Sequence, residues 1–237
     1  MSSTQPRGRV LALVTSAADY EKAGYRTGLW LGELTHFMDV LTKAGYAVDV
    51  ASPRGGHVPI DPESLKAPVV KMGGTDEFYQ DPAAMRVLRE STAVADVRVE
   101  DYDAVYLAGG HGTMFDFRDP ALTRLVGAFA DAGKVVSAVC HGPVGLLDVT
   151  LADGSHLLEG KKVTGFTWRE EKVAGRRDAV PFSLEQALGE RGRYEKSRVP
   201  MKPHVVTDGL LVTGQNPTSA TGVGKAVVKL LKKQRKR

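Results

Sequence analysis

The chain has 237 residues, of which 42% are hydrophobic, and these values are typical of a globular protein with a full core. Its net charge of +4 comes from the C-terminal end: without the seven basic residues from Lys225 to Arg237, 25 basic residues stand against 28 acidic ones. We therefore expect a solvated basic tail over 232–237 and, without a basic face or a reading motif, no nucleic-acid partner. No long apolar run and no leader pattern occur, so we expect neither a membrane partner nor a signal peptide.

Short apolar runs predict buried strands, and apolar residues at positions i, i+3, i+4 and i+7 predict helices. Strands that alternate with helices predict an α/β fold with a mostly parallel sheet covered on both faces. In such a sheet the functional site lies beyond the carboxyl ends of the strands. In chain order the patterns predict a strand over 9–16, a helix through 34–41, a strand over 46–51, a strand over 102–108, a helix over 120–132 and a strand over 134–139.

The C-terminal part continues the same pattern. It predicts a strand over 163–167, a hairpin over 204–213 with Asp208-Gly209 as its turn, and an amphipathic helix through 223–231. No repeat or linker divides the chain, so we expect a single domain over 1–237.

Two long segments are expected to leave the core and to cap a site or build an interface. They cover residues 54–80 and 168–203, and the second contains a predicted helix over 182–191.

The only cysteine, Cys140, directly follows the strand over 134–139 and precedes His141. Ala138 and Gly142 complete the spacing A-x-C-x-G of a nucleophile elbow, a sharp turn from strand to helix. Strained backbone is expected at its apex. The helix start and a neighbouring imidazolium favour a thiolate near neutral pH. A small buried hydrophobe is the alternative. With a single cysteine no internal disulfide is possible, and the cytoplasm is the expected compartment.

Glycines follow the strand over 102–108, where backbone N–H groups can approach a ligand closely. The residues are Gly109, Gly110 and His111. We expect the N–H groups of Gly110 and His141 to act as an oxyanion hole and the whole segment to bind substrate.

Three acids are candidates for the site. Glu33 lies near the start of the first helix, from where it could reach Cys140, although a helix-dipole acid is the alternative. Glu170 and Glu171 follow the strand over 163–167, and either could orient His141. The histidines His36 and His111 have no ligand at close spacing, so we expect polar packing roles for them and no metal site.

Several separated segments resemble the ThiJ/PfpI superfamily, and specifically its glyoxalase III and heat-shock chaperone branch. The resemblance runs in order from about residue 9 to 231. It implies a flavodoxin-like three-layer sandwich and a homodimer. The segments that carry it are 27–36, 51–56, 108–112, 138–143, 163–167 and 212–217.

The same resemblance implies roles for residues. Cys140 would be the nucleophile, His141 its triad partner and Glu33 the acid beside the thiol, with Glu171 preferred to Glu170 as the triad acid. The implied reaction converts a small dicarbonyl substrate, methylglyoxal, to D-lactate without glutathione. Cys140 would form a hemithioacetal, and Glu33 would move a proton between the two substrate carbons. This chemistry implies no metal and no organic cofactor.

Other functions remain open. A stress-response chaperone would need an exposed apolar patch, and a protein deglycase would use the same thiol. A cysteine peptidase depends on how widely the pocket opens, and a redox sensor on oxidation of the thiol. A glutamine amidotransferase is disfavoured, because none of the six histidines is followed two residues later by a glutamate.

Overall fold

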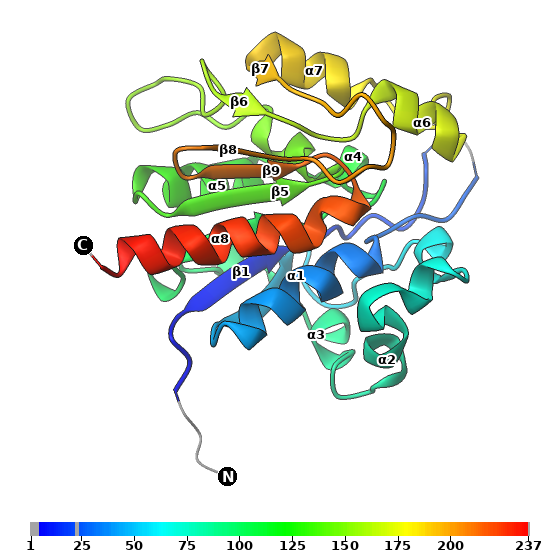
Figure 1. The fold of residues 1–237 in the computed structure, drawn as a ribbon, viewed down its shortest axis with the longest axis horizontal. Helices are drawn as coiled ribbons and strands as arrows, with labels where there is room; N and C mark the ends of the chain where they lie inside the picture. The colour runs from blue at the N-terminus through cyan, green and yellow to red at the C-terminus, as the bar shows by residue number, and fades with distance from the viewer. Residues whose placement is uncertain (1–4, 22–23, 237) are drawn as a thin grey trace.

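A seven-stranded sheet organises the chain, in the order β3-β2-β1-β4-β5-β9-β8. The computed structural model describes residues 5–21 and 24–236; residues 1–4 and 237, the ends of the expected domain and of the expected basic tail, lie outside the described residues. The strands are β1 (Arg9–Leu13), β2 (Ala47–Ser52), β3 (Thr92–Ala93), β4 (Ala104–Leu107), β5 (Val135–Val139), β8 (Val205–Asp208) and β9 (Leu211–Gly214) (Figure 1).

Neighbouring strands are parallel throughout this sheet except at β8, which runs antiparallel to β9 at one edge. In the central pair, Leu107 of β4 lies beside Ala138 of β5, which itself lies beside Thr213 of β9. The carboxyl ends of these strands therefore meet at one edge of the sheet, where the loop residues that follow them come together.

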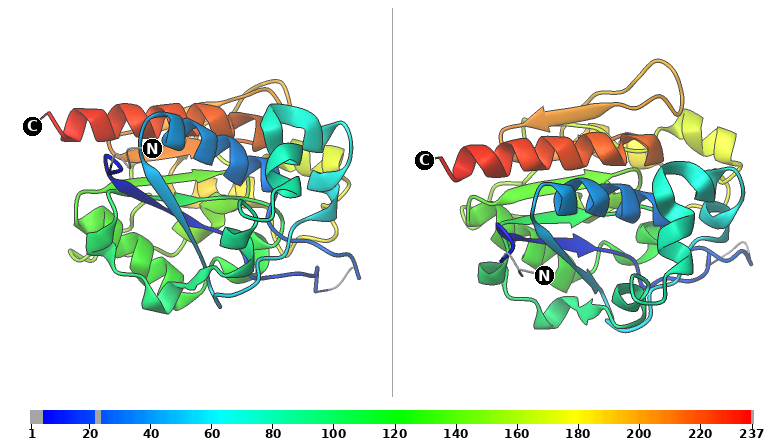
Figure 2. Two further views of the ribbon diagram at one scale, coloured as in Figure 1. Left: turned by 90° about the horizontal axis from the view of Figure 1, so that it is seen from below. Right: turned by 60° about the horizontal axis from the view of Figure 1, so that its bottom comes forward.

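Helices cover both faces of the sheet, which lies between the two helix layers in Figure 2. One layer contains α1 (Leu31–Lys43) and α8 (Ala220–Gln234), and the other contains α4 (Thr113–Asp116) and α5 (Pro120–Asp131). In α5, Asp119 caps the helix by accepting hydrogen bonds from the N–H groups of Ala121 and Leu122, with Pro120 at the first helical position.

Side chains along each strand alternate between the two layers. In β1, Val10 and Ala12 pack in the core beneath α1 and α8, whereas Leu11 and Leu13 pack in the core beneath α5. This arrangement confirms the predicted α/β three-layer sandwich with a mostly parallel sheet. None of the helices in the described part of the chain is long and apolar enough to cross a bilayer.

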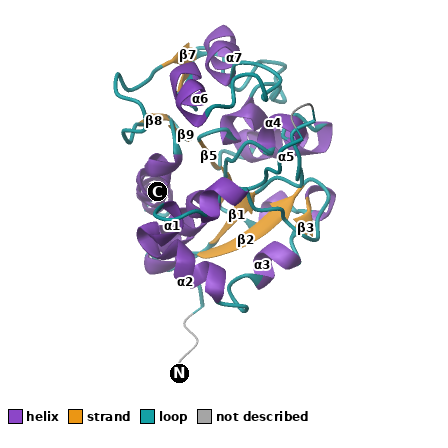
Figure 3. Ribbon diagram, turned by 90° about the vertical axis from the view of Figure 1, so that its right-hand side faces the viewer, coloured by secondary structure: helices purple, strands orange, loops and turns teal. Residues whose placement is uncertain are grey.

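The main helices of the two segments expected to leave the core lie near the bottom and near the top of the view in Figure 3, although Arg176 of the second segment comes within 3.8 Å of Glu63 of the first. The first, 54–80, holds the 3-10 helices η1 (Pro62–Leu65) and η2 (Val69–Gly74) and the helix α2 (Thr75–Gln80), and is followed by α3 (Arg86–Arg89), η3 (Val94–Asp96) and η4 (Val99–Asp101). The second, 168–203, holds α6 (Trp168–Ala174), α7 (Leu184–Arg191) and β7 (Arg193–Tyr194). The predicted helix over 182–191 is confirmed as α7.

The expected strand over 163–167 is largely wrong. Only β6 (Lys162–Val163) is extended, and it pairs with β7 in a separate two-stranded sheet. Beyond it the N–H of Thr164 donates to the Thr213 hydroxyl, and the N–H of Phe166 donates to the Cys140 carbonyl oxygen. Through these contacts the segment crosses the carboxyl ends of β5 and β9, and it does not pair with either strand.

Three further local expectations need correction. The helix expected after Cys140 is the short 3-10 helix η5 (Gly142–Leu146). In the C-terminal hairpin Asp208 pairs with Leu211, so the turn consists of Gly209 and Leu210 and not of Asp208-Gly209. The expected basic tail begins inside α8, which extends to Gln234.

Candidate active site

Cys140 occupies the apex of the turn after β5 with a φ of 58°, a conformation that residues other than glycine rarely adopt. Two hydrogen bonds of 2.9 Å hold this backbone: the N–H of Cys140 donates to the Gly214 carbonyl oxygen, and its own carbonyl oxygen accepts from Phe166. A Cβ at Gly142 would lie 2.2 Å from the carbonyl oxygen of Leu107, so only glycine fits there. The predicted elbow is therefore present, and its thiol-bearing residue is 3% exposed.

A chain of short contacts connects the thiol to Glu171. The Cys140 Sγ atom lies 3.3 Å from Nδ1 of His141, whose Nε2 lies 2.9 Å from Oε2 of Glu171. The other oxygen of Glu171, Oε1, lies 2.6 Å from Nε2 of His111. The two imidazole rings are 4.2 Å apart between centroids. Glu171 thus joins both histidines from the first turn of α6.

The ionisation states of these groups follow from their contacts. Burial disfavours the charged form of Glu171, but the charge of His141 and hydrogen bonds to both imidazoles hold the pKa of Glu171 well below its usual range. Burial and then the charge of His141 lower the pKa of His111. Because an ionised carboxylate only accepts hydrogen bonds, each histidine must donate through Nε2–H. A neutral His141 then presents an unprotonated Nδ1 to the thiol.

Glu33, in the first turn of α1, is a second acid that interacts with the Cys140 thiol, and it is fully buried. Its Oε2 accepts a hydrogen bond of 2.7 Å from the N–H of Gly109. A Cβ at Gly109 would lie 2.6 Å from that oxygen, so the contact requires glycine. Burial raises the pKa of Glu33 to about 8, although interactions with the Cys140 thiol and the Gly109 N–H oppose the rise. Oε1 of Glu33 has no hydrogen bond of regular geometry among the described residues.

The surroundings of Cys140 disfavour the thiolate that was expected near neutral pH. Burial, followed by the charge of Glu33, raises the pKa of the Cys140 thiol well above its usual value. The short η5 offers only a few aligned peptide groups to counter this effect. The thiol therefore needs a base at the moment of reaction, and Nδ1 of His141 is in position to be that base.

Glu170 lies next to Glu171 in the chain but faces a different set of groups. Its Oε1 accepts from the Met201 N–H at 2.7 Å and from the side-chain amides of Gln215 and Asn216, both at 2.9 Å. Its Oε2 accepts from the N–H and the hydroxyl of Thr167. The structure therefore places Glu171, and not Glu170, against His141.

The expected oxyanion donors, the N–H groups of Gly110 and His141, belong to residues that line a cavity at Cys140. Neither N–H has an acceptor within the described part of the protein. Gly110 has a φ of 108°, and a Cβ there would lie 2.3 Å from the carbonyl oxygen of Gly28. His111 lines the same cavity, whereas Gly109, the third residue expected to bind substrate, does not line it and donates its N–H to Glu33.

The cavity has a volume of about 160 Å³ and is polar only near the nucleophile. Sequence reasoning missed its apolar walls. Three of the wall residues lie in segments that carried the resemblance and could have been noticed there, whereas the others lie outside them. The apolar wall residues are Trp30, Phe166, Val173, Ala174, Met201 and Pro217.

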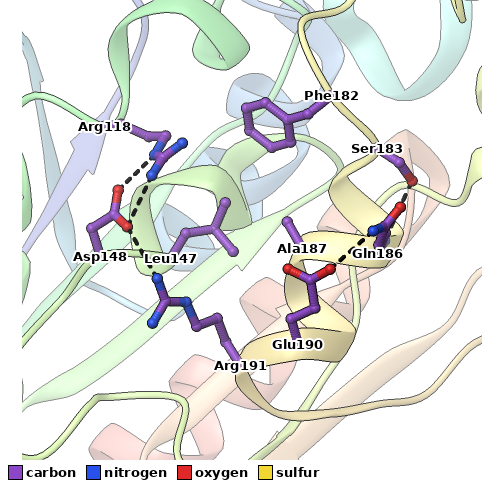
Figure 4. Close-up of a pocket in the computed structure, with 9 residues that line it drawn as sticks. All are labelled: Arg118, Leu147, Asp148, Phe182, Ser183, Gln186, Ala187, Glu190 and Arg191. Atoms are coloured by element: carbon purple, nitrogen blue, oxygen red, sulfur yellow. Dashed lines mark hydrogen bonds and ion pairs between the residues drawn. The ribbon is translucent and has the colours of Figure 1, made fainter.

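A larger pocket of about 290 Å³, beside α7, contains none of these groups. In Figure 4, Arg118 and Arg191 both point toward Asp148, and Gln186 contacts Glu190. Both arginines are thus paired with Asp148, Glu190 accepts a hydrogen bond from Gln186, and neither cysteine nor histidine lines the pocket. We therefore assign the candidate site to the smaller cavity.

The residues His111, His141 and Glu171 could also bind a metal ion, since their side chains are common metal ligands and their ligand atoms lie within 4.8 Å of one another. The hydrogen bonds already account for this proximity. His36 lies elsewhere, with Nε2 at 2.8 Å from the carbonyl oxygen of Met72, in a polar packing contact. The expectation of no metal stays a prediction.

Comparisons with known proteins identify relatives that match nearly the whole chain. HSP31 of Saccharomyces cerevisiae, a glutathione-independent glyoxalase, is 30% identical, with 96% of this chain and 99% of that protein covered. The solved structure of the Francisella tularensis Rapid Encystment Protein 24 kDa is 36% identical with a TM-score of 0.89, and 94% of this chain and 99% of that one are covered. Glyoxalase III from Candida albicans is 30% identical with a TM-score of 0.87, and 94% and 96% are covered. The model of the DJ-1/PfpI family matches residues 28–230, and this chain therefore belongs to the DJ-1/PfpI family, as the resemblance predicted.

Proposed function

We propose that this protein is a glutathione-independent glyoxalase that converts methylglyoxal and water to D-lactate. The observation that carries the proposal is the position of the Cys140 thiol between two different groups. On one side His141 and Glu171 form a base for the thiol proton. On the other side Glu33 offers a carboxyl group whose pKa is raised to about 8. The names of the relatives in yeasts support the same activity.

The first step forms a covalent bond between sulfur and the aldehyde carbon. Nδ1 of His141, 3.3 Å from Sγ, takes the thiol proton as the sulfur attacks. Glu171 stabilises the imidazolium that results. The aldehyde oxygen gains negative charge, accepts hydrogen bonds from the N–H groups of Gly110 and His141, and then takes the proton back from the imidazolium. The product is a hemithioacetal.

The second step moves hydrogen between the two substrate carbons. The carboxylate of Glu33 removes the proton from the former aldehyde carbon, and the electron pair forms an enediolate whose negative charge lies on the oxygen of the adjacent carbon. The neutral carboxyl group returns the proton to that adjacent carbon, and the hydroxyl proton of the first carbon passes to the negatively charged oxygen, so that the first carbon becomes the carbonyl of a thioester and the second carries the hydroxyl group. One carbon is oxidised as the other is reduced, so no external oxidant or reductant is needed. A pKa near the working pH suits a group that acts as base and then as acid.

The third step releases the product. Water attacks the thioester carbonyl, the carbon–sulfur bond breaks, and the Cys140 thiol is restored with its proton. The sum of the three steps is one dicarbonyl and one water giving one 2-hydroxy acid. Since Glu33 approaches from a fixed side, the proton returns to one face of the carbon, which accounts for a single lactate enantiomer.

The cavity size favours this reaction over peptide hydrolysis. A cavity of roughly 150 Å³ is large enough for benzene, which has one more heavy atom than methylglyoxal. The cavity of about 160 Å³ therefore suits a small dicarbonyl, and the 3% exposure of Cys140 leaves little access for a polypeptide backbone. We also propose a cytoplasmic location, where a single reactive thiol stays reduced, and a homodimer, which sedimentation would test.

The decisive experiment measures D-lactate from methylglyoxal in the absence of glutathione. The intact reduced protein is compared with Cys140→Ala, Glu33→Gln and the matched surface variant Glu190→Gln. We expect activity in the intact protein and in Glu190→Gln, and its loss in the two site variants. A folded, reduced protein that yields no lactate would overturn the proposal. Full activity in Cys140→Ala would overturn the mechanism.

A further inference from the structure

A second apolar cavity adjoins the catalytic one. Its volume is about 120 Å³, and it shares three wall residues with the cavity at Cys140: Trp30, Met201 and Pro217. Its remaining walls include Val69 and Met72 of η2, so the segment 54–80 closes it from the far side. The two cavities therefore lie on either side of a common wall, one containing the nucleophile and the other containing no reacting group.

Resting on the proposed glyoxalase function, we propose that the preferred substrates are 2-oxoaldehydes with an unbranched apolar chain longer than a methyl group. The aldehyde would react at Cys140, and the chain would extend past Met201 into the second cavity. Methylglyoxal fits into the first cavity alone and would leave the second one without contact to the substrate.

Two polar side chains at the second cavity, His36 and Thr218, already bind other protein groups, which argues against a polar substituent. Nε2 of His36 contacts the Met72 carbonyl oxygen at 2.8 Å and the Thr75 hydroxyl at 3.2 Å. The Thr218 hydroxyl donates to the carbonyl oxygen of Met201 at 2.8 Å. A hydroxylated, sugar-derived chain would find few free partners there and would lose its hydration. An alkyl chain has no such cost.

The side chain of Met201 in the common wall can move aside while its backbone stays in place. The backbone of Met201 is fixed at both ends, since its N–H donates to the buried carboxylate of Glu170 and its carbonyl oxygen accepts from Thr218. Its side chain is 39% exposed and unbranched. Methionine side chains of this kind adapt their shape to a ligand at little cost. The wall can thus open for a chain while the segment that carries it stays in place.

The test compares kcat/KM for methylglyoxal and for 2-oxohexanal, which carries three more methylene groups. Each buried methylene favours binding by up to about fourfold, so we expect the ratio to favour 2-oxohexanal by about tenfold. Val69→Trp fills the second cavity and should bring this ratio to about one or below. Val69→Leu, which adds less volume, should lower it in part. The matched control is Val199→Trp, since Val199 is 56% exposed and lines neither cavity; its ratio should equal that of the intact protein.

The outcomes separate this inference from the proposed function. Turnover of methylglyoxal with no preference for 2-oxohexanal, or a preference that Val69→Trp and Val69→Leu leave unchanged, would overturn the longer-chain inference alone. Absence of turnover for both aldehydes would overturn the proposed function, and this inference with it. Circular dichroism of each variant shows that the compared proteins are folded.

Discussion

Oε2 of Glu171 lies 2.9 Å from Nε2 of His141, and this contact determines which imidazole nitrogen faces the nucleophile. Because the carboxylate is ionised and only accepts, the proton of the neutral ring resides on Nε2. Nδ1, 3.3 Å from Sγ of Cys140, is then free to accept the thiol proton. The acid thus acts on the thiol through the orientation and tautomer of the histidine.

Replacement of the triad acid should remove most of the activity while the fold persists. Glu171→Gln keeps the shape of the side chain but loses the charge that stabilises an imidazolium, and its amide group can force the other tautomer. We expect kcat to fall by roughly 10³ to 10⁴, as for the acid of other triads. Steady-state kinetics with methylglyoxal measure this, with Glu190→Gln as the control. A decrease below tenfold would show that Glu171 has no such role.

Replacement of the neighbouring acid, Glu170, should lower the stability of the fold. Glu170 is fully buried and accepts five hydrogen bonds from Thr167, Met201, Gln215 and Asn216. In Glu170→Gln at least one donor would meet an amide N–H₂ group and lose its partner. We expect unfolding in urea to require about 2 to 4 kcal/mol less free energy than for the intact protein. Equal stability of Glu170→Gln and the exposed Glu190→Gln would contradict this account.

The contrast between these two acids shows what the sequence can predict. Local pattern alone left Glu170 and Glu171 open, although the segment does carry a signal: Thr167 and Glu170 have the T-x-x-E spacing of a capping box, which assigns Glu170 to the helix start. The elbow was predictable because its small residues are close in sequence to Cys140. Met201 was not, because it is held at the site by contacts with residues far away in the chain, Glu170 and Thr218.

The raised pKa of the Cys140 thiol could not be predicted from the sequence either. An elbow motif indicates backbone N–H groups near the sulfur, which favour the anion. It does not indicate how deeply the sulfur is buried or which carboxyl group lies beside it. In the folded protein burial and Glu33 dominate, and both favour the neutral thiol. The prediction of a thiolate included only the local groups and left out these two opposing effects.

The pH profile should show the ionisation of Glu33. The base of the second step must be a carboxylate, and burial raises the pKa of Glu33 to about 8. We therefore expect kcat/KM for methylglyoxal to increase by about tenfold per pH unit below this value and to level off above it. Measurements from about pH 6 to about pH 9 check this. A profile that is flat across this range would exclude Glu33 as the ionising base.

The same carboxyl group should make stability depend on pH. The folded protein holds the proton of Glu33 up to about pH 8, whereas the unfolded chain releases it near the ordinary pKa of a glutamate, 4.5. Its stabilising effect is therefore complete below the unfolded value and is lost as pH rises through the folded one. Glu33→Gln has no such proton, so its unfolding free energy should exceed that of the intact protein by up to a few kcal/mol above pH 8, and the excess should vanish in acid. Urea unfolding of the intact protein and of Glu33→Gln, above pH 8 and in acid, measures this difference in stability. A variant that gains no stability over the intact protein at the higher pH would contradict the prediction.

The strain at the nucleophile should be measurable in two variants that both lack the thiol. Cys140 has a φ of 58°, which a side chain with a Cβ disfavours and glycine adopts freely. Cys140→Ala retains this strain, whereas Cys140→Gly removes it, so we expect the glycine variant to be more stable by about 1 kcal/mol. In an unstrained strand or helix the order would be reversed, because glycine gains more freedom on unfolding. Urea unfolding of the two variants therefore gives a result whose sign decides the matter: a more stable alanine variant would show that the surrounding hydrogen bonds do not hold the elbow under strain.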